Sequence, residues 1–170
     1  GFRDGRSPDV LAVSHDPHVA GGTAFDDRVG WPPWPSATAP ALELPLVFSG
    51  TGVGPGTSAP TTVTLDAVAP TMAAIIGLDR PHPEVRSGKA IAGIGGGQAP
   101  RLALVIAMKG LGTDRPTGTM PALDRLAGAG VSLTARPGSL PLDPAALLTT
   151  IGTGGTPSEH GVVGTLLRND

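Results

Sequence analysis

The chain has 170 residues, a formal net charge of −2 at pH 7 and no cysteine. That length suffices to bury a substantial core, and the charge excludes the basic patch through which proteins bind the phosphates of nucleic acids. Without cysteine, a disulfide framework and thiolate metal sites are excluded as well. Glycine (26) and proline (19) are abundant, so we expect long loops between the ordered elements.

Neither a membrane span nor a signal peptide is expected. The longest apolar run is LALVIAM at 102–108, which is far too short to cross a bilayer as a helix. The first residues do not have the charged and apolar regions of a secretory signal. We therefore expect a cytoplasmic protein without a membrane span.

The first half of the chain predicts two strands separated by a proline-rich stretch. The first strand is VLAVS at 10–14 and the second is LPLVFS at 44–49. Between them, WPPWPSATAP cannot form a helix interior or a central strand, because proline lacks the backbone amide that both require. Trp31 and Trp34 in this stretch could form a contact surface for a partner, although such residues more often anchor a loop on the core.

A helix is predicted over LDAVAPTMAAIIG at 65–77, after the loop GTGVGPGTSAPTT. Asp66 is the expected cap, Pro70 fits the first turn and Gly77 ends the helix. One face of this helix carries the apolar residues Val68, Met72, Ile75 and Ile76. The glycine-rich stretch GIGGGQ at 93–98 then forms a flexible join to the second half of the chain.

The second half predicts the order strand, helix, strand, helix. The four segments are LALVIA, TMPALDRLAGAG, VSLT and DPAALLTTIGTG. LALVIA is a continuous apolar run, as buried parallel strands are. Thr119 is the expected cap of the first helix, and Asp143 caps the second, with Pro144 in its first position. This alternation predicts an α/β fold with a parallel sheet.

Several of these stretches together carry a family resemblance. They are LALVIAMKGLG, TMPALDRLAGAGV, LLTTIGTGGTPSEHGVVG, LPLVFSGTGV and TLDAVAPTMAAIIGL. The chain resembles the alkaline phosphatase superfamily, most closely its type I phosphodiesterase and nucleotide pyrophosphatase branch. The resemblance implies an α/β fold with a partial, mainly parallel sheet, flanked by helices and connected by long Gly/Pro-rich loops.

The segments stand in a different order from that of the family. Residues 1–97 resemble the C-terminal part of the family domain, and residues 98–170 resemble its N-terminal part, which bears the nucleophile. The chain could span a junction between tandem copies, be a permuted remnant, or be a segment of a longer protein. The middle of the family pattern, which supplies most metal ligands, is not recognisable.

The resemblance implies hydrolysis of a small phosphoester or phosphodiester with two divalent metal ions, zinc or manganese. In the family a Thr or Ser at a helix N-terminus attacks, and the helix end stabilises the anion. Here Lys109 stands at the position of a metal-binding Asp, and Pro144 stands at the nucleophile, preceded by Asp143. Thr165 replaces the Asn that follows the family's His-Gly. The hydrolase activity is therefore expected to be incomplete or lost.

The candidate catalytic residues are accordingly Asp143, as an unusual carboxylate nucleophile, His160 and Thr165. For His160 the alternative is a histidine that stabilises a turn by bonding to the backbone. The alternative function is a non-catalytic binding or assembly domain that keeps the scaffold. Apolar surface left by missing sheet neighbours would favour binding to a partner or self-association of such a domain. A fragment without independent function is a third possibility.

A candidate metal site lies in SHDPHV, where His15, Asp16 and His18 are close together. Two imidazoles and a carboxylate could bind one zinc-like ion or contribute to a family metal site. Ligands so close in sequence need a further ligand from elsewhere in the chain, and the alternative is a solvated polar loop.

Other motifs favour ordinary loops. His82, with Arg80, Arg86 and Lys89, could bind an anion, but a solvated charged loop is the simpler interpretation. GTGVGPGT lacks the Lys-Ser/Thr ending of a phosphate-binding loop, and GIGGGQ does not lie between a strand and a helix. Neither glycine cluster predicts a nucleotide site.

Overall fold

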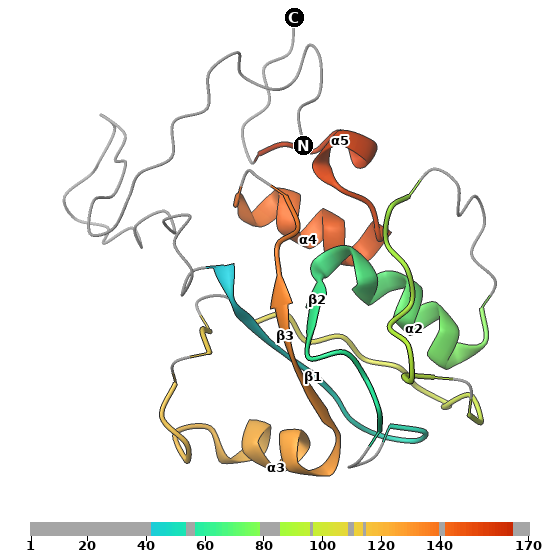
Figure 1. The fold of residues 1–170 in the computed structure, drawn as a ribbon, viewed down its shortest axis with the longest axis vertical. Helices are drawn as coiled ribbons and strands as arrows, with labels where there is room; N and C mark the ends of the chain where they lie inside the picture. Colours follow the sequence, from blue (N-terminus) through green and yellow to red (C-terminus); the bar gives the residue numbers. More distant parts are fainter. Residues whose placement is uncertain are drawn as a thin grey trace, which may run out of the picture.

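The structure, a computed structural model, describes residues 42–53, 57–78, 86–95, 97–108, 111–113, 115–139 and 142–164. These residues form the strands β1 (Leu44–Phe48), β2 (Thr62–Thr64) and β3 (Val131–Arg136). The helical elements are η1 (Leu65–Ala67), α2 (Val68–Ile76), α3 (Pro121–Ala129), α4 (Pro144–Thr153) and α5 (Pro157–His160). The predicted α/β class is confirmed (Figure 1), while the strand predicted at 10–14 lies outside the described residues.

The three strands form one mixed sheet in the order β1-β3-β2. β1 pairs antiparallel with β3, with Leu46 opposite Leu133, and β2 pairs parallel with β3, with Val63 opposite Ala135. The expectation of a mainly parallel sheet is therefore wrong for β1. That expectation relied on LALVIA as the strand before β3, and LALVIA is not in this sheet.

The central place of β3 agrees with its side-chain pattern. Val131, Leu133 and Ala135 are buried, and the residues between them are more exposed. Because successive side chains of a strand point to opposite faces, these three lie on one face. Where β3 ends beside the start of β1, an ion pair of 3.0 Å between Arg136 and Glu43 joins the two strands.

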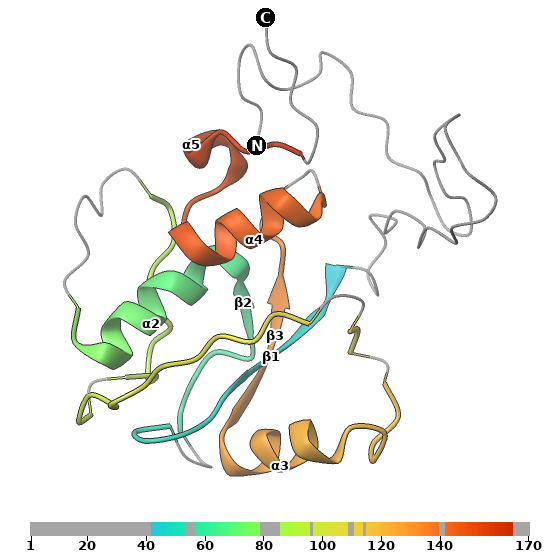
Figure 2. The same cartoon turned by 180° about the vertical axis from the view of Figure 1, so that it is seen from behind.

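The helices divide between the two ends of the sheet. β2 and β3 run parallel and end on the same side, where η1 and α2 follow β2 and α4 follows β3 (Figures 1 and 2). α3 precedes β3 and lies at the opposite end. As a result α4 contacts η1, α2 and α5. Within the described ranges, every helix is too short or too polar to pass through a lipid bilayer.

Both halves of the chain contribute to the core, which is formed by residues of β1, η1 and β3 and of the loops around positions 53 and 91–94. Its buried residues are Phe48, Val53, Ala67, Ile91, Ile94, Val131 and Leu133. Partly buried residues that pack against them are Leu46, Ala59, Val63, Met72 and Ile75. These are aliphatic side chains and one phenylalanine, as expected of a chain with 3% aromatic residues.

The helix predicted at 65–77 is present, as η1 followed directly by α2. Pro70 lies in the first turn of α2, and Gly77 ends the helix in the left-handed conformation, with φ of 68°, which glycine adopts without strain. Asp66 is not a cap, because it lies inside η1 and accepts hydrogen bonds from side-chain hydroxyls instead. Ile76 is 39% exposed, so the predicted apolar face is shorter than expected.

The expected caps of the two later helices differ in outcome. Asp143 is the N-cap of α4, and its Oδ1 accepts the amide of Ala145 at 2.8 Å. Thr119 does not cap α3. The residue before α3 is Met120, and the hydroxyl of Thr119 donates to the carbonyl of Pro116 at 2.7 Å.

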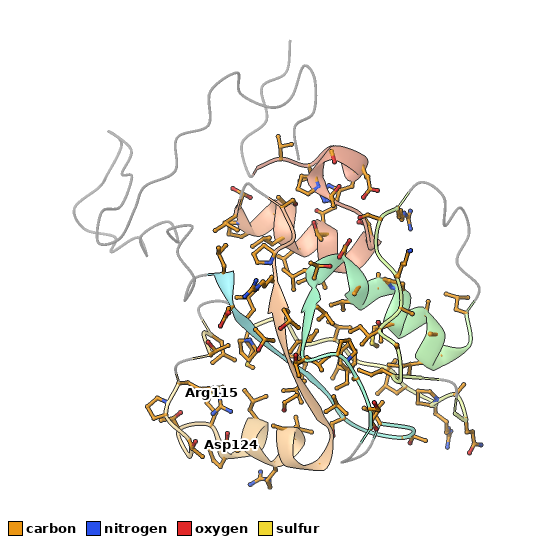
Figure 3. The ribbon with its side chains drawn as sticks, in the orientation of Figure 1. Arg115 and Asp124 are labelled. Carbon is orange, nitrogen blue, oxygen red and sulfur yellow. The ribbon has the colours of Figure 1, made fainter. Side chains whose placement is uncertain are left out.

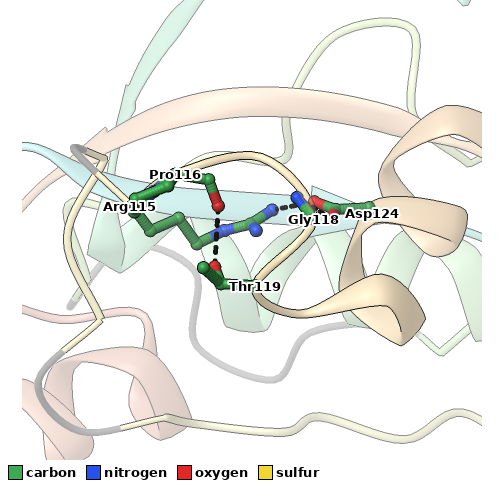
Figure 4. A network of polar contacts seen from close by, with 5 residues as sticks. All are labelled: Arg115, Pro116, Gly118, Thr119 and Asp124. Atoms are coloured by element: carbon green, nitrogen blue, oxygen red, sulfur yellow. Dashed lines mark hydrogen bonds and ion pairs between the residues drawn. The ribbon is translucent and has the colours of Figure 1, made fainter.

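An ion pair holds the loop before α3 in place of the expected cap. Arg115 Nη2 lies 2.5 Å from Oδ1 of Asp124, and Oδ2 of Asp124 accepts the amide of Gly118 at 2.9 Å (Figures 3 and 4). The hydrogen bond from Arg115 is the main reason why the pKa of Asp124 is below its usual value, and the Gly118 amide lowers it further. A carboxylate in the first turn also interacts favourably with the positive end of the helix.

The segment LALVIAM is the largest departure from the predicted fold. The sequence predicts a buried strand, yet residues 102–108 lie outside the sheet, and all of them are exposed. Leu102, Leu104 and Ile106 expose 79%, 71% and 68% of their surface. Both sides of the central strand β3 are already occupied, by β1 and β2. An apolar run of this kind is buried when both faces of its sheet are covered, and residues 102–108 have no such cover because they lie outside the described sheet.

Candidate functional site

A group of polar side chains lies at the end of β2 and on the segments that follow β2 and β3. They are Thr64, Asp66, Ser87, Asp143, Thr150, Glu159 and His160. In sheets with parallel strands, ligands bind beyond the carboxyl ends of the strands. This edge is therefore where a site is expected, and it holds two of the predicted catalytic residues, Asp143 and His160.

The start of α4 is closed by the protein's own groups. Asp143 is 5% exposed, and its carboxylate accepts the amide of Ala145. Pro144 stands at the first position of the helix and has no amide to offer. The N-terminus of a helix attracts anions through its unpaired amides and its positive dipole. Here a carboxylate already occupies that end, so a substrate phosphate would meet negative charge.

Ser87 lies between two carboxylates. Its hydroxyl is 2.9 Å from Oδ2 of Asp66 and 3.1 Å from Oε2 of Glu159. Oδ1 of Asp66 also accepts the hydroxyl of Thr64. A serine hydroxyl carries one proton, so it donates to only one of the two carboxylates at a time. The contact joins η1 to α5 through a residue that is distant from both in sequence.

Glu159 fixes the start of the short helix α5. Its Oε2 accepts the amide of Thr156 at 2.5 Å and the hydroxyl of the same residue at 3.1 Å, as the glutamate of a capping box does. Burial raises the pKa of Glu159, but the hydrogen bonds from Thr156 and Ser87 outweigh burial and hold the pKa below its ordinary value. The side chain is therefore a charged structural acceptor at neutral pH.

His160 connects α5 to α4. Its Nδ1 accepts the amide of Val162 at 3.1 Å, and its Nε2 lies 3.1 Å from Oγ1 of Thr150. Because Nδ1 is an acceptor, the proton of the neutral ring is on Nε2, which donates to Thr150. Burial lowers the pKa of His160, although the Glu159 carboxylate opposes the shift. The backbone contact is the arrangement that the turn-stabilising interpretation predicts.

The pair of Thr150 and His160 does not form an exposed nucleophile. An imidazole beside a hydroxyl is the arrangement that activates serine and threonine nucleophiles. Thr150, however, is 2% exposed and lies in the interior of α4. Nε2 also donates to the hydroxyl instead of accepting its proton. The pair is better suited to holding α5 on α4 than to attacking a substrate.

Two contacts of backbone amides that the sequence does not predict hold this edge together. The amide of Gly88 donates to the carbonyl of Gly154 at 3.0 Å. A Cβ on Gly88 would lie 2.0 Å from the carbonyl oxygen of Asp66 and 2.6 Å from that of Gly154. Thr71 is fully buried, and its hydroxyl accepts the amide of Ile91 at 2.9 Å. The threonine of DAVAPT is the sequence signal that could have indicated the second contact.

The remaining predicted site residues cannot be placed at this edge. His15, Asp16, His18 and Thr165, together with Lys109, lie outside the described residues. Trp31, Trp34, Arg80 and His82 do so as well. Of the proposed anion-binding loop, Arg86 and Lys89 are described, and both are exposed.

The described side chains do not fit the two-metal centre that the family resemblance implies. Among them no three His, Asp or Glu side chains lie close enough together to hold a metal ion. Asp66 and Glu159 are linked by the hydroxyl of Ser87, and a pair of carboxylates is fewer than the ligands that zinc requires. No catalytic step through a metal can be built from this part of the chain.

Comparison with known proteins leaves the family open. No protein-family model matches the chain, and neither a curated protein nor a solved structure matches it. The resemblance to the alkaline phosphatase superfamily therefore stays a prediction from the sequence.

Proposed function

We propose that this chain is an alkaline-phosphatase-like α/β segment, related to metal-dependent phosphodiesterases and pyrophosphatases, that does not hydrolyse phosphoesters by itself. The observation that carries the proposal is the start of α4, where the resemblance expects an attacking hydroxyl. There the chain has Asp143, bonded to the amide of Ala145, and Pro144. Neither group offers a hydroxyl nucleophile, and the carboxylate repels the phosphate that the helix end would otherwise attract.

In the proposed arrangement, segments from the two ends of a family domain pack against each other within this chain. The resemblance assigns β1 and α2 to the end of a family domain, and α4 to its beginning. In this chain β1 pairs with β3, and α2 contacts α4. The amide of Gly88 and the carbonyl of Gly154 are bonded across the same boundary.

A direct assay tests the inactivity. The purified chain is incubated with bis(p-nitrophenyl) phosphate in zinc or manganese, and the release of nitrophenolate is compared with that of an Asp143→Ala variant purified in parallel. We expect both proteins to give the same rate as a blank preparation. Metal-dependent turnover that disappears in Asp143→Ala would overturn the proposal and make Asp143 a carboxylate nucleophile.

An assembly role is the second candidate, and a separate observation favours it. Residues 102–108 expose a continuous apolar segment, and a surface of this kind marks an interaction site. A chain that remains monomeric in sedimentation at all concentrations and turns over substrate would exclude this role. The exposed side chains and backbone of residues 102–108 indicate which kind of partner would bind.

A further inference from the structure

The segment 102–108, here called the apolar segment, lies outside the described sheet, and all of its residues are exposed. It is drawn as the yellow trace that passes the sheet in Figure 2. Its residues Leu102, Leu104, Val105, Ile106 and Met108 are between 41% and 79% exposed. None of the side chains within it is charged. This is the largest run of exposed aliphatic residues in the described part of the chain.

The backbone of the apolar segment is as open as its side chains. In the portion of the chain that the structure describes, no backbone hydrogen bond involves residues 102–108. Extended backbone with unpaired amides and carbonyls is a template for strand addition. The partner that best satisfies both the backbone and the side chains is another apolar strand.

The sequence of the segment is complementary to itself. Read in reverse, LALVIAM becomes MAIVLAL, with alanine at the same two positions and valine at the centre. In an antiparallel ladder centred on Val105, the opposed pairs are Val105 with Val105, Leu104 with Ile106, Ala103 with Ala107, and Leu102 with Met108. Each pair matches a large with a large or a small with a small aliphatic side chain, and such cross-strand pairs are the unit of sheet stability.

We propose that two copies of this chain pair through Leu102–Met108 as an antiparallel, two-fold symmetric β-ribbon. In a two-fold contact, if residue i of one copy faces residue j of the other, then residue j of the first copy also faces residue i of the second. The sequence of the segment allows this, because it is nearly the same when read in reverse. The proposal rests on the second candidate function, the assembly role, and needs neither a phosphate site nor the family relationship.

The edges of the chain's own sheet are poorer partners for the segment. β1 has Pro45 within its five residues, and proline removes a ladder donor. β2 has only three residues, so it covers less than half of the segment. A second copy of the segment has the full length and no proline.

The short length of the contact, residues 102–108 on each chain, predicts a weak dimer. A stable interface buries about 800 Å² on each partner, and the apolar patch of a typical monomer is about 300 to 600 Å². A two-stranded ribbon is also only marginally stable alone. We expect a monomer–dimer equilibrium with a Kd on the order of micromolar or weaker.

Single cysteines test the register, because the chain has no cysteine of its own. In the proposed ribbon, Val105→Cys places the two thiols opposite each other, within reach of a disulfide. Leu102→Cys places them six residues apart along the ladder, about 20 Å. Under mild oxidation we expect a covalent dimer from Val105→Cys and none from Leu102→Cys. Equal cross-linking of both variants would indicate a parallel register or unspecific aggregation and would refute the proposal.

Sedimentation of charge variants tests the contact without cross-linking. Val105→Lys sets two ammonium groups against each other at the two-fold axis, so we expect its dimer Kd to rise at least about tenfold. Leu78→Lys is the matched control, because Leu78 is 62% exposed and lies outside the segment; its Kd should change by less than about twofold. Both positions are exposed, so the fold should survive in either variant, and a thermal melt verifies this. A wild-type chain that stays monomeric at high concentration would refute the proposal, and so would an equal change of the dimer Kd in the two variants.

Discussion

The hydroxyl of Thr71 accepts the backbone amide of Ile91 at 2.9 Å and donates to the carbonyl of Ala67 at 2.6 Å. Thr71 is fully buried, and Ile91 belongs to the core. The contact therefore ties the first turns of α2 to the segment that returns beneath it. It also gives the threonine of DAVAPT a structural reason that is independent of any catalysis.

Removal of that hydroxyl is expected to destabilise the protein. Thr71→Val keeps the shape of the side chain but leaves the buried amide of Ile91 without its acceptor, which costs about 1 to 3 kcal/mol in the free energy of unfolding. Thr71→Ser retains the hydroxyl and should lose less than Thr71→Val does. Urea titration of the three proteins measures the difference, and equal stability of the valine variant and the wild type would contradict the role assigned to the hydroxyl.

A second prediction concerns the close approach of three backbones at Gly88. In Gly88→Ala the new Cβ would meet the carbonyl oxygens of Asp66 and Gly154, so the backbone must move, and we expect a loss of about 1 to 3 kcal/mol. Gly128→Ala in α3 is the matched control, because a Cβ there meets no atom within 4 Å. Alanine in a helix should stabilise it by about 0.5 to 1 kcal/mol. Thermal melts should therefore shift in opposite directions.

The cap of α4 makes a prediction about stability and activity together. Asp143→Ala removes the acceptor for the amide of Ala145 and should destabilise the chain by about 0.5 to 2 kcal/mol, whereas Asp143→Asn, which keeps an acceptor, should be close to the wild type. Phosphodiester turnover should be absent from all three proteins. A loss of turnover in both variants, with stability unchanged, would assign Asp143 to catalysis instead of capping.

The half-buried imidazole of His160 predicts that stability decreases on mild acidification. Burial lowers the pKa of His160 from the ordinary value of 6.5. The unfolded chain therefore binds the proton more readily, and stability is lost as the pH falls below 6.5 towards the folded pKa. Protonation of Nδ1 would also oppose the amide of Val162 that it accepts.

The matched variant for this prediction is His160→Asn, whose side-chain oxygen can accept the amide of Val162 without titrating. Thermal melts at several pH values between 7 and 5 should show the wild type losing stability faster than the variant. The carboxylates of the described residues whose pKa values are shifted, Asp124 and Glu159, titrate below this range because their pKa values are lowered. Parallel curves for the two proteins would show that His160 contributes nothing to the pH dependence.

Local patterns predicted most of the ordered elements. α2 with Gly77 at its end, and α4 with Asp143 as its cap, depend on residues a few positions apart, and propensity and capping act over that range. β1 and β3 were likewise indicated by short apolar runs. β2 is not predicted by the sequence, since its three residues are too few to show an alternating pattern.

Contacts between distant segments were not predictable in the same way. The direction of β1 in the sheet and the position of the apolar segment depend on which strands are available as neighbours, and no local pattern contains that information. The same is true of the site. The cap at Asp143 follows from its neighbours, but Ser87 and Thr71 have partners twenty or more residues away, and the sequence does not show which backbone a hydroxyl will meet.

The position of β3 between β1 and β2 has a consequence for synthesis of the protein. Both outer strands are made first, and neither has its partner until Val131–Arg136 has left the ribosome. At about 5 to 20 residues per second, the newly made β1 waits for several seconds with its apolar side chains in water. During that interval a nascent chain of this protein is a ready client for chaperones, and a pause in translation before β3 would lengthen its exposure.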